Sequence, residues 1–313
     1  MMNLEQISND SSAAAKAQPC IDAAAMTDVG RARPLNEDAY LIATLQRSMV
    51  VHDTSPASAR GWFAGGPAGT LLMVADGMGG QGGGEIASRV AVNAVVSYLL
   101  NVMPWATPPV AAIPVRDDAS PPGVRSQLAS ALVAGDSTVK TTGVQTGAPD
   151  MGTTLTMALV LWPVLYVAHV GDTRCYLLRS GTLSRLTTDH TMAQKLAEGA
   201  AEPVDPNSHL HHILWNSLGG SDQLPKPEMT KLGLELGDVL LLCSDGLTKH
   251  VSDPEIATLL GADEPNDVRC AKLVALANAQ GGSDNVTVVV ATARTASDVS
   301  PAFASCITPR LQL

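Results

Sequence analysis

Three aspartates at the ends of apolar segments most constrain what this chain can fold into. Asp76 follows the run LLMVA, Asp245 follows the run VLLLCS, and Asp284 stands two residues before the run VTVVVA. Short apolar runs bounded in this way are typical of buried strands. A carboxylate at the end of such a strand is held rigidly and stays in contact with water. Each Asp taken singly also fits an ordinary turn, because Asp-Gly is common in hairpins.

The three aspartates together favour a metal site. Asp76-Gly77 is followed by a helical pattern from Glu85 and not by a returning strand, so it is not a hairpin turn. Converging carboxylates repel one another unless cations lie between them. Oxygen ligands without Cys or His favour a hard cation, Mg²⁺ or Mn²⁺.

The glycine-rich stretch after Asp76 has competing interpretations. Gly77, Gly79 and Gly82 form a GxGxxG pattern between a strand and a helix, as in dinucleotide-binding folds. Asp76 would then place a carboxylate against a pyrophosphate, and no acidic residue follows about 20 positions on. No Gly-Lys-Ser/Thr occurs, which excludes a P-loop. The favoured interpretation is that the glycines let the backbone approach a metal.

Charge and cysteine content restrict the partners and the compartment. Lys and Arg total 20 and Asp and Glu total 30, and the net charge of −10 disfavours nucleic acids and anionic membranes as partners. The five cysteines form no CxxC, which indicates a reducing compartment. The start has no basic n-region, and the longest apolar stretch, Leu155–Val170, is too short and broken to span a bilayer. These features predict a cytoplasmic protein without a nucleic-acid or membrane partner.

The hydrophobic pattern predicts an α+β fold in one domain over residues 24–294, with tails at 1–23 and 295–313 and surface insertions at Ser55–Gly69 and Pro104–Gly123. Tight turns at Trp162-Pro163 and Ser180-Gly181 indicate antiparallel hairpins. The expected strands are Tyr40–Leu45, Leu71–Ala75, Thr154–Leu161, Val164–Val170, Arg174–Arg179, Val239–Cys243 and Val286–Thr292. The expected helices are Glu85–Met103, Arg125–Lys140, one after Thr191, Asp253–Leu260 and Val268–Ala279.

Two arginines precede a second acidic cluster. Arg31 and Arg33 stand just before Asn36-Glu37-Asp38. A guanidinium beside a carboxylate–metal cluster suits a phosphate, which it binds with two parallel hydrogen bonds. The alternative is that both arginines are solvated surface charges that pair with Glu37.

The ordered set of motifs resembles the metal-dependent serine/threonine phosphatases of the protein phosphatase 2C (PPM) family, in its bacterial form. The resemblance runs from about residue 24 to 294. It rests on Thr27-Asp28-Val29-Gly30, Arg33, Asn36-Glu37-Asp38, Asp76-Gly77-Met78-Gly79-Gly80, Met151-Gly152-Thr153-Thr154, Val170-Gly171-Asp172-Thr173-Arg174, Thr188-Asp189-His190, Ser244-Asp245-Gly246-Leu247 and Ser283-Asp284-Asn285.

The resemblance implies a four-layer α-β-β-α sandwich, with two antiparallel sheets flanked by helix pairs and two Mn²⁺ or Mg²⁺ ions at one end. Asp76 would bridge the ions, the Gly77 carbonyl would bind one, and Asp245 and Asp284 would complete the set. Glu37 and Asp38 would act through metal-bound waters, Arg33 would hold the phosphate, and Asp150 would reach a weaker third ion. A metal-bound hydroxide would attack phosphorus in line with the leaving oxygen.

Several other residues carry expectations. Met78 replaces the histidine that eukaryotic relatives place after the first Asp-Gly as a proposed general acid, so the general acid is left unassigned.

Asp172 and Arg174 are expected to form a structural ion pair, and Asp189 and His190 to shape the approach to the site. The segment 191–214 corresponds to the family's flap, and its histidines (His209, His211 and His212) are interpreted as incidental and not as metal ligands.

The sequence therefore predicts a protein phosphatase that removes phosphate from phosphoserine and phosphothreonine and opposes a Ser/Thr kinase. A first alternative is an inactive phosphatase-like binding or regulatory domain. A second is a family relative that acts on a small phosphorylated molecule.

Overall fold

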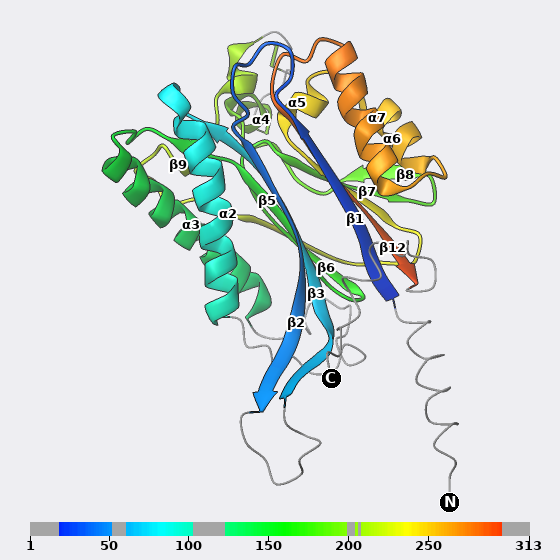
Figure 1. Cartoon of the computed structure of the whole chain (residues 1–313). Helices are drawn as coiled ribbons and strands as arrows, with labels where there is room; N and C mark the ends of the chain where they lie inside the picture. Colours follow the sequence, from blue (N-terminus) through cyan, green and yellow to red (C-terminus); the bar gives the residue numbers. More distant parts are fainter. Residues whose placement is uncertain (1–18, 52–60, 103–122, 199–203, 206–207, 296–313) are drawn as a thin grey trace, which may run out of the picture.

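The computed structural model describes residues 19–51, 61–102, 123–198, 204–205 and 208–295. In this part of the chain, two antiparallel sheets pack against each other and helices cover their outer faces (Figure 1). The arrangement confirms the expected α+β sandwich with four layers. None of the described helices is long and apolar enough to cross a bilayer.

The first sheet has five strands in the order β1-β12-β11-β7-β8. They are β1 (Pro19–Asp28), β7 (Arg174–Arg179), β8 (Thr182–Arg185), β11 (Val239–Cys243) and β12 (Val286–Thr295). Its outer face packs against the helices that follow β11. These are α5 (Asp245–Thr248), α6 (Asp253–Gly261) and α7 (Asn266–Ala279).

The second sheet follows the order β10-β6-β5-β3-β4-β9, and β2 pairs with β3. Its strands are β2 (Asp38–Val51), β3 (Gly61–Met78), β4 (Gly152–Thr153), β5 (Leu155–Leu161), β6 (Val164–Val170), β9 (Leu218–Gly219) and β10 (Glu228–Gly233). Helices α2 (Gly83–Val102) and α3 (Val124–Thr146) cover its outer face. The remaining elements are the 3-10 turns η2 (Gly80–Gly82) and η4 (His209–His212) and helix α4 (Met192–Ala197).

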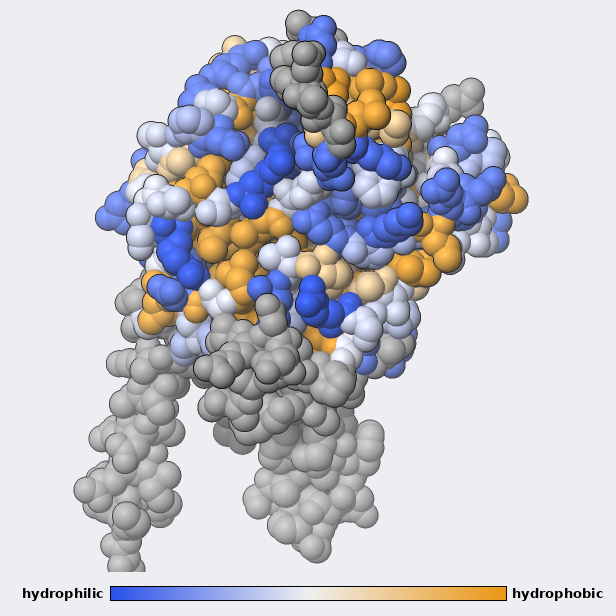
Figure 2. Space-filling view, turned by 180° about the vertical axis from the view of Figure 1, so that it is seen from behind, coloured by the Kyte–Doolittle hydropathy of each residue, from blue (hydrophilic) through white to orange (hydrophobic). Residues whose placement is uncertain are grey.

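The side-chain alternation of the strands builds a core in three layers. Leu72 of β3 points between the sheets and packs with Val289, whereas Leu71 and Met73 point toward α2 and pack with Val95. Strands β5, β6 and β11 are buried throughout because one face meets the other sheet and the opposite face meets helices. Seen from behind (Figure 2), much of the described surface is hydrophilic, with hydrophobic residues in separate patches.

Most of the expected elements are confirmed. Strands β6, β7 and β11 have the expected bounds, and both hairpins turn at the expected positions. Helix α6 begins with a capping box in which Ser252 and Glu255 satisfy each other's backbone groups.

Two expected boundaries are wrong. Strand β1 begins at Pro19, which pairs with Thr295, so the proposed boundary before residue 24 cuts through a strand. Gly61 pairs with Val51, so the second half of the expected insertion at 55–69 belongs to the long β2–β3 hairpin. In both cases the backbone ladder continues beyond the apolar pattern that marked the strand. The insertion expected at 104–123 lies outside the described residues except for Gly123.

Candidate metal centre

A cleft lined by acidic residues lies where the two sheets meet at one end of the sandwich. The three strand-end aspartates, Asp76, Asp245 and Asp284, all line it, as the sequence predicts. Asp76 lies near the end of β3, Asp245 begins α5 after β11, and Asp284 precedes β12. The cleft is also lined by Arg33, Glu37, Gly77, Met78, Asp172, His212, Lys249 and Asn285.

The two threonines of the Gly-Thr-Thr segment hold the backbone of Asp76. The Thr154 hydroxyl accepts a hydrogen bond from the Asp76 amide at 3.0 Å. The Asp76 carbonyl accepts bonds from the Thr153 hydroxyl and the Thr154 amide, each at 2.9 Å. The Asp76 carboxylate therefore projects into the cleft from a backbone that is fixed on both sides.

Gly77 is required by the crowding of the backbone behind the cleft. A Cβ at this position would collide with the carbonyl oxygens of Gly84 and Glu37. The Gly77 amide donates to the Glu37 carbonyl at 3.2 Å, which ties the end of β3 to the loop before β2. The glycine thus lets three backbone segments meet beside the expected metal ligands.

Asp38 lies beneath the cleft on β2. Its Oδ2 accepts a hydrogen bond from the Ser244 hydroxyl at 2.7 Å, and Ser244 Oγ in turn accepts one from the Thr287 amide at 2.9 Å. Burial, with repulsion from neighbouring carboxylates, raises the pKa of Asp38 to about 7 and raises that of Asp76 well above its usual value. In the metal-free protein, the negative charges of Asp38 and Asp76 are therefore not balanced by nearby cations.

Asn285 connects the Asp284 loop to the loop before β2. Its Oδ1 accepts a hydrogen bond from the Glu37 amide at 2.8 Å, and its Nδ2 donates to the carbonyls of Val29 and Leu35, both at 2.9 Å. Asn285 is buried, so these bonds are made away from water. One side chain thereby positions Glu37 and Asp284 relative to each other.

Two basic side chains bind Asp284. Arg33 forms a fork to it, with Nε 2.8 Å from Oδ1 and Nη2 3.0 Å from Oδ2. The Lys249 ammonium lies 2.7 Å from Asp284 Oδ2 and 2.6 Å from Asp245 Oδ2. Burial would raise the pKa of Asp284, but these bonds and the charges of Lys249 and Arg33 bring it below its ordinary value.

The donor set fits divalent cations. Asp38 Oδ1 and Asp245 Oδ1 are buried and have no hydrogen-bond partner among the described residues. Such oxygens carry a desolvation cost that a bound cation would offset. The converging ligands are carboxylate and carbonyl oxygens, which hard cations such as Mg²⁺ and Mn²⁺ prefer.

Comparison with known proteins decides the family. The model of the protein phosphatase 2C family matches residues 59–265. Protein phosphatase PhpP of Streptococcus pneumoniae is 30% identical over 267 residues, which cover 85% of this chain and 94% of PhpP. The chain belongs to the protein phosphatase 2C family.

Two further comparisons concern PstP of Mycobacterium tuberculosis, a serine/threonine protein phosphatase. PstP is 37% identical over 225 residues, which are 71% of this chain and 40% of PstP, so the chain spans less than half the length of that relative. A crystal structure of the PstP catalytic domain with two manganese ions has a TM-score of 0.66 and 30% identity. The aligned region covers 88% of this chain and all of the chain in that crystal structure.

The structure bears on two expectations about the site. Arg174 does not pair with Asp172; its guanidinium makes a two-pronged bond to Asp189, with Nη2 2.6 Å from Oδ2. Asp172 instead lines the acidic cleft, where burial and repulsion from Asp245 raise its pKa to about 8. Asp150, expected near a third ion, is exposed and does not line the cleft. Asp150 lies two residues before β4, and its role toward a third ion stays a prediction.

The segment expected to form the flap contributes one histidine to the cleft. His212 and Leu214 line it together with the Met78–Gly80 segment. Thr191 and Leu214 form an isolated bridge at the base of the flap, and the Trp215 ring packs against His190 at 5.0 Å. His212 therefore lies beside the site, and the expectation that the flap histidines are not metal ligands stays a prediction.

A second group could hold a metal by distance alone. Ligand atoms of His169, His190 and Glu228 lie within 4.8 Å of one another. Both ring nitrogens of His169 are already hydrogen-bonded, Nδ1 to Thr156 and Nε2 to the Thr188 carbonyl. Burial lowers the pKa of His169 to about 3 and that of His190 to about 4, so both are neutral at pH 7.

His190 braces the loop that carries Asp172. Its Nδ1 accepts a bond from the Gly171 amide at 3.0 Å, and its own amide donates to the Gly171 carbonyl at 2.7 Å. This contact supports the expectation that His190 shapes the approach to the site. It also explains the buried histidine pair as a structural network.

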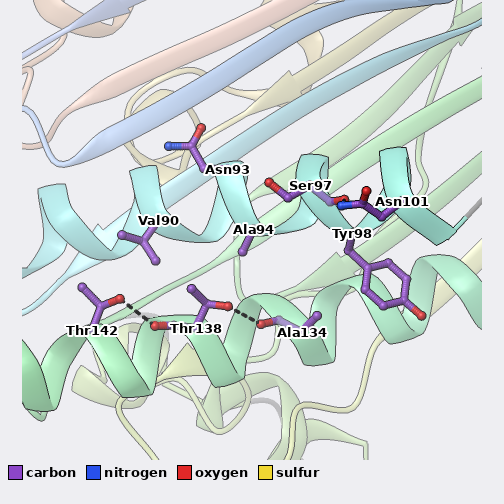
Figure 3. A pocket seen from close by; sticks show the side chains of 9 residues that line it. All are labelled: Val90, Asn93, Ala94, Ser97, Tyr98, Asn101, Ala134, Thr138 and Thr142. Carbon is purple, nitrogen blue, oxygen red and sulfur yellow. Dashed lines mark hydrogen bonds between the residues drawn. The ribbon is translucent and has the colours of Figure 1, made fainter.

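A groove between α2 and α3 has no comparable chemistry (Figure 3). Its described lining contains no Asp, Glu, His, Cys, Lys or Arg. The hydroxyls of Thr138 and Thr142 donate to carbonyls of their own helix, at 2.8 Å each. The acidic cleft is therefore the place where catalysis is expected.

Sequence reasoning missed Lys249 and the clamp around Asp76. Lys249 follows Asp245 by four residues at the start of a helix, a spacing that predicts an i,i+4 ion pair. The Gly-Thr-Thr segment contributed to the family resemblance only. Its contact with Asp76 could not be predicted from a local pattern, because Asp76 lies 78 residues before Thr154.

Proposed function

We propose that this chain hydrolyses phosphoserine and phosphothreonine on proteins with the help of two divalent ions, Mn²⁺ or Mg²⁺. The observation that carries the proposal is the convergence of Asp76, Asp245 and Asp284 in one cleft beside Arg33. The names of PstP and PhpP as protein phosphatases support it, and so does the manganese in the PstP structure. A Ser/Thr kinase and its targets are the partners that this activity implies.

In this proposal the side chains of the cleft divide the work. Asp76, Asp245, Asp284 and the Gly77 carbonyl hold the ions, while Glu37 and Asp38 hold water molecules around them. The bound ions supply an activated water at neutral pH and neutralise charge on the phosphate. Among the carboxylates that line the cleft, Asp172 and Asp245 are suited to a third ion.

Arg33 is suited to bind the substrate phosphate. Its side chain is 50% exposed and its fork rests on Asp284 at the edge of the cleft. A guanidinium can exchange one oxyanion for another without losing its two parallel hydrogen bonds. The planar fork thus orients the phosphate for in-line attack.

The test is hydrolysis of p-nitrophenyl phosphate and a phosphothreonine peptide with EDTA, Mg²⁺ or Mn²⁺. We expect metal-dependent turnover by the wild type and a loss of about 100-fold or more in Asp245→Asn, the size typical of losing one group that stabilises transition-state charge. Asp222→Asn, an exposed carboxylate away from the cleft lining, should match the wild type. No turnover by folded wild type with any metal would overturn the proposal in favour of an inactive binding domain.

The same assay separates the proposal from its second alternative. A panel of phosphopeptides and small phosphorylated molecules compares kcat/KM for the two classes. Preference for small phosphates would favour a relative that acts on metabolites. The cytoplasmic localisation is a prediction from the cysteine pattern, the start of the sequence and its short apolar stretches.

A further inference from the structure

Lys249 lies among the carboxylates that the proposed function assigns to the metal. Its ammonium is 2.6 Å from Asp245 Oδ2 and 2.7 Å from Asp284 Oδ2, and its side chain is 25% exposed. The start of α5 imposes this position, because the Lys249 amide donates to the Asp245 carbonyl at 2.8 Å and places both side chains on one helix face. A single cation thus bridges two expected ligands that belong to different segments of the chain.

The bridge ties up oxygens that a divalent ion would need. Asp284 has both carboxylate oxygens bonded to basic side chains, Oδ2 to Lys249 and Oδ1 to Arg33. Asp245 has Oδ2 bonded to Lys249, while Oδ1 has no hydrogen-bond partner among the described residues. A metal that approaches these two residues must therefore replace the ammonium or share its oxygens.

The charge of Lys249 affects how many divalent ions the cleft needs for neutrality. Five carboxylates line the cleft and Asp38 lies beneath them, while Arg33 and Lys249 are the Arg and Lys side chains in the described lining. Two divalent ions and these two basic groups would together match the charge of six carboxylates. With Lys249 in place, the centre needs no third divalent ion before substrate binds.

We propose that Lys249 is a resident cation of the metal centre, which competes with divalent ions for Asp245 and Asp284 and limits the centre to two ions. The inference rests on the proposed function, since it assumes that this cleft binds metal. It makes Lys249 a residue that tunes metal affinity, and not one that touches the substrate. Neutralising it should strengthen metal binding, whereas neutralising a residue that merely positions ligands should weaken it.

The experiment is calorimetric titration of EDTA-stripped protein with Mn²⁺. For Lys249→Met we expect binding about 10- to 100-fold tighter than wild type, the range by which groups around metal ligands commonly alter affinity, and a stoichiometry of up to three ions. Lys249→Arg retains the charge and should restore affinity to within a few-fold of wild type. Lys272→Met, which removes a lysine paired with Glu264 elsewhere, is the matched control and should bind as the wild type does.

The outcomes of this titration distinguish a failure of the Lys249 proposal from a failure of the proposed function. Unchanged or weaker Mn²⁺ binding by Lys249→Met, with wild type that binds two ions and turns over phosphopeptide, would overturn the role of Lys249 alone. Absence of Mn²⁺ binding by folded wild type would overturn both this inference and the proposed function. If Lys249→Met does not fold without metal, Lys249→Gln, which keeps a polar side chain of similar length, is titrated under the same criteria.

Discussion

Asp38 lies directly opposite Asp76 in the antiparallel pairing of β2 with β3. Like charges placed opposite each other destabilise a sheet, so this pair costs stability unless a proton or a cation lies between its members. The Ser244 hydroxyl satisfies one oxygen of Asp38, and the other has no partner among the described residues. The pairing of Asp38 with Asp76 therefore lowers the stability of the metal-free protein and creates a site that attracts cations.

The first prediction concerns the pH dependence of the metal-free protein. The pKa of Asp38 is about 7 in the folded protein against an ordinary value of 3.8. Between these values the folded state keeps a proton that the unfolded chain has released, so stability falls as pH rises through about 7. In EDTA, Asp38 alone should lower the free energy of unfolding in urea by on the order of 2–3 kcal/mol between pH 5 and pH 8.

Asp38→Asn should remove the contribution of Asp38 to the slope, because its side chain does not titrate, whereas Asp76 and Asp172, whose pKa values are also raised, keep theirs. Asp222→Asn, exposed and outside the cleft lining, should keep it. Saturating Mn²⁺ should also reduce the pH dependence of the free energy of unfolding, since the ion replaces the proton on Asp38. A slope that survives unchanged in Asp38→Asn would assign the pH dependence to other groups.

The second prediction concerns Asp189, whose bond to Arg174 braces the loop behind the cleft. The pair is two-pronged, and its side chains are only 24% and 16% exposed. Asp189→Asn should lower the free energy of unfolding by about 2–3 kcal/mol, somewhat less than for a fully buried pair. Urea unfolding in EDTA measures this without a contribution from metal.

Arg89→Gln is the control for that measurement, because Arg89 and Glu85 form an exposed i,i+4 pair. Its effect should stay within about 0.5 kcal/mol. Equal effects of the two substitutions would contradict the structural role of the Arg174–Asp189 pair.

The third prediction concerns the flap. His212 lines the cleft, whereas His209 does not. His212→Ala should reduce kcat/KM for a phosphothreonine peptide about fivefold, the size of one hydrogen bond, and leave p-nitrophenyl phosphate nearly unchanged. His209→Ala should leave both substrates nearly unchanged. Release of bound Mn²⁺ from His212→Ala would instead make this histidine a metal ligand.

The fourth prediction concerns the guanidinium fork. Arg33→Lys keeps the charge but loses the second parallel hydrogen bond, so kcat/KM should fall about 10- to 100-fold, as for loss of one charged hydrogen bond. Inhibition by inorganic phosphate should weaken in parallel. Arg31→Lys serves as the control, because Arg31 is exposed and does not line the cleft. Equal losses in both variants would mean that Arg33 is not the phosphate ligand.

The sequence alone determined the apolar strands that lead to Asp76 and Asp245 and the strand that begins after Asp284. Each position follows from local information, since a short apolar run meets an acidic residue and a glycine or serine. Local patterns also predicted a helix over Asp253–Leu260, where α6 lies, although its N-cap is Ser252. These features depend on neighbours within a few residues, so the sequence expresses them directly.

The tertiary structure alone decided which of these residues meet. Ser244 binds Asp38 across 206 positions of sequence, and Arg174 prefers Asp189 to the nearer Asp172. Such partners depend on the order of strands in each sheet and on which side of a strand faces the cleft. A local pattern contains neither, because a shift of one residue in register moves every side chain to the opposite face. For the same reason, only the folded structure places Lys249 between Asp245 and Asp284.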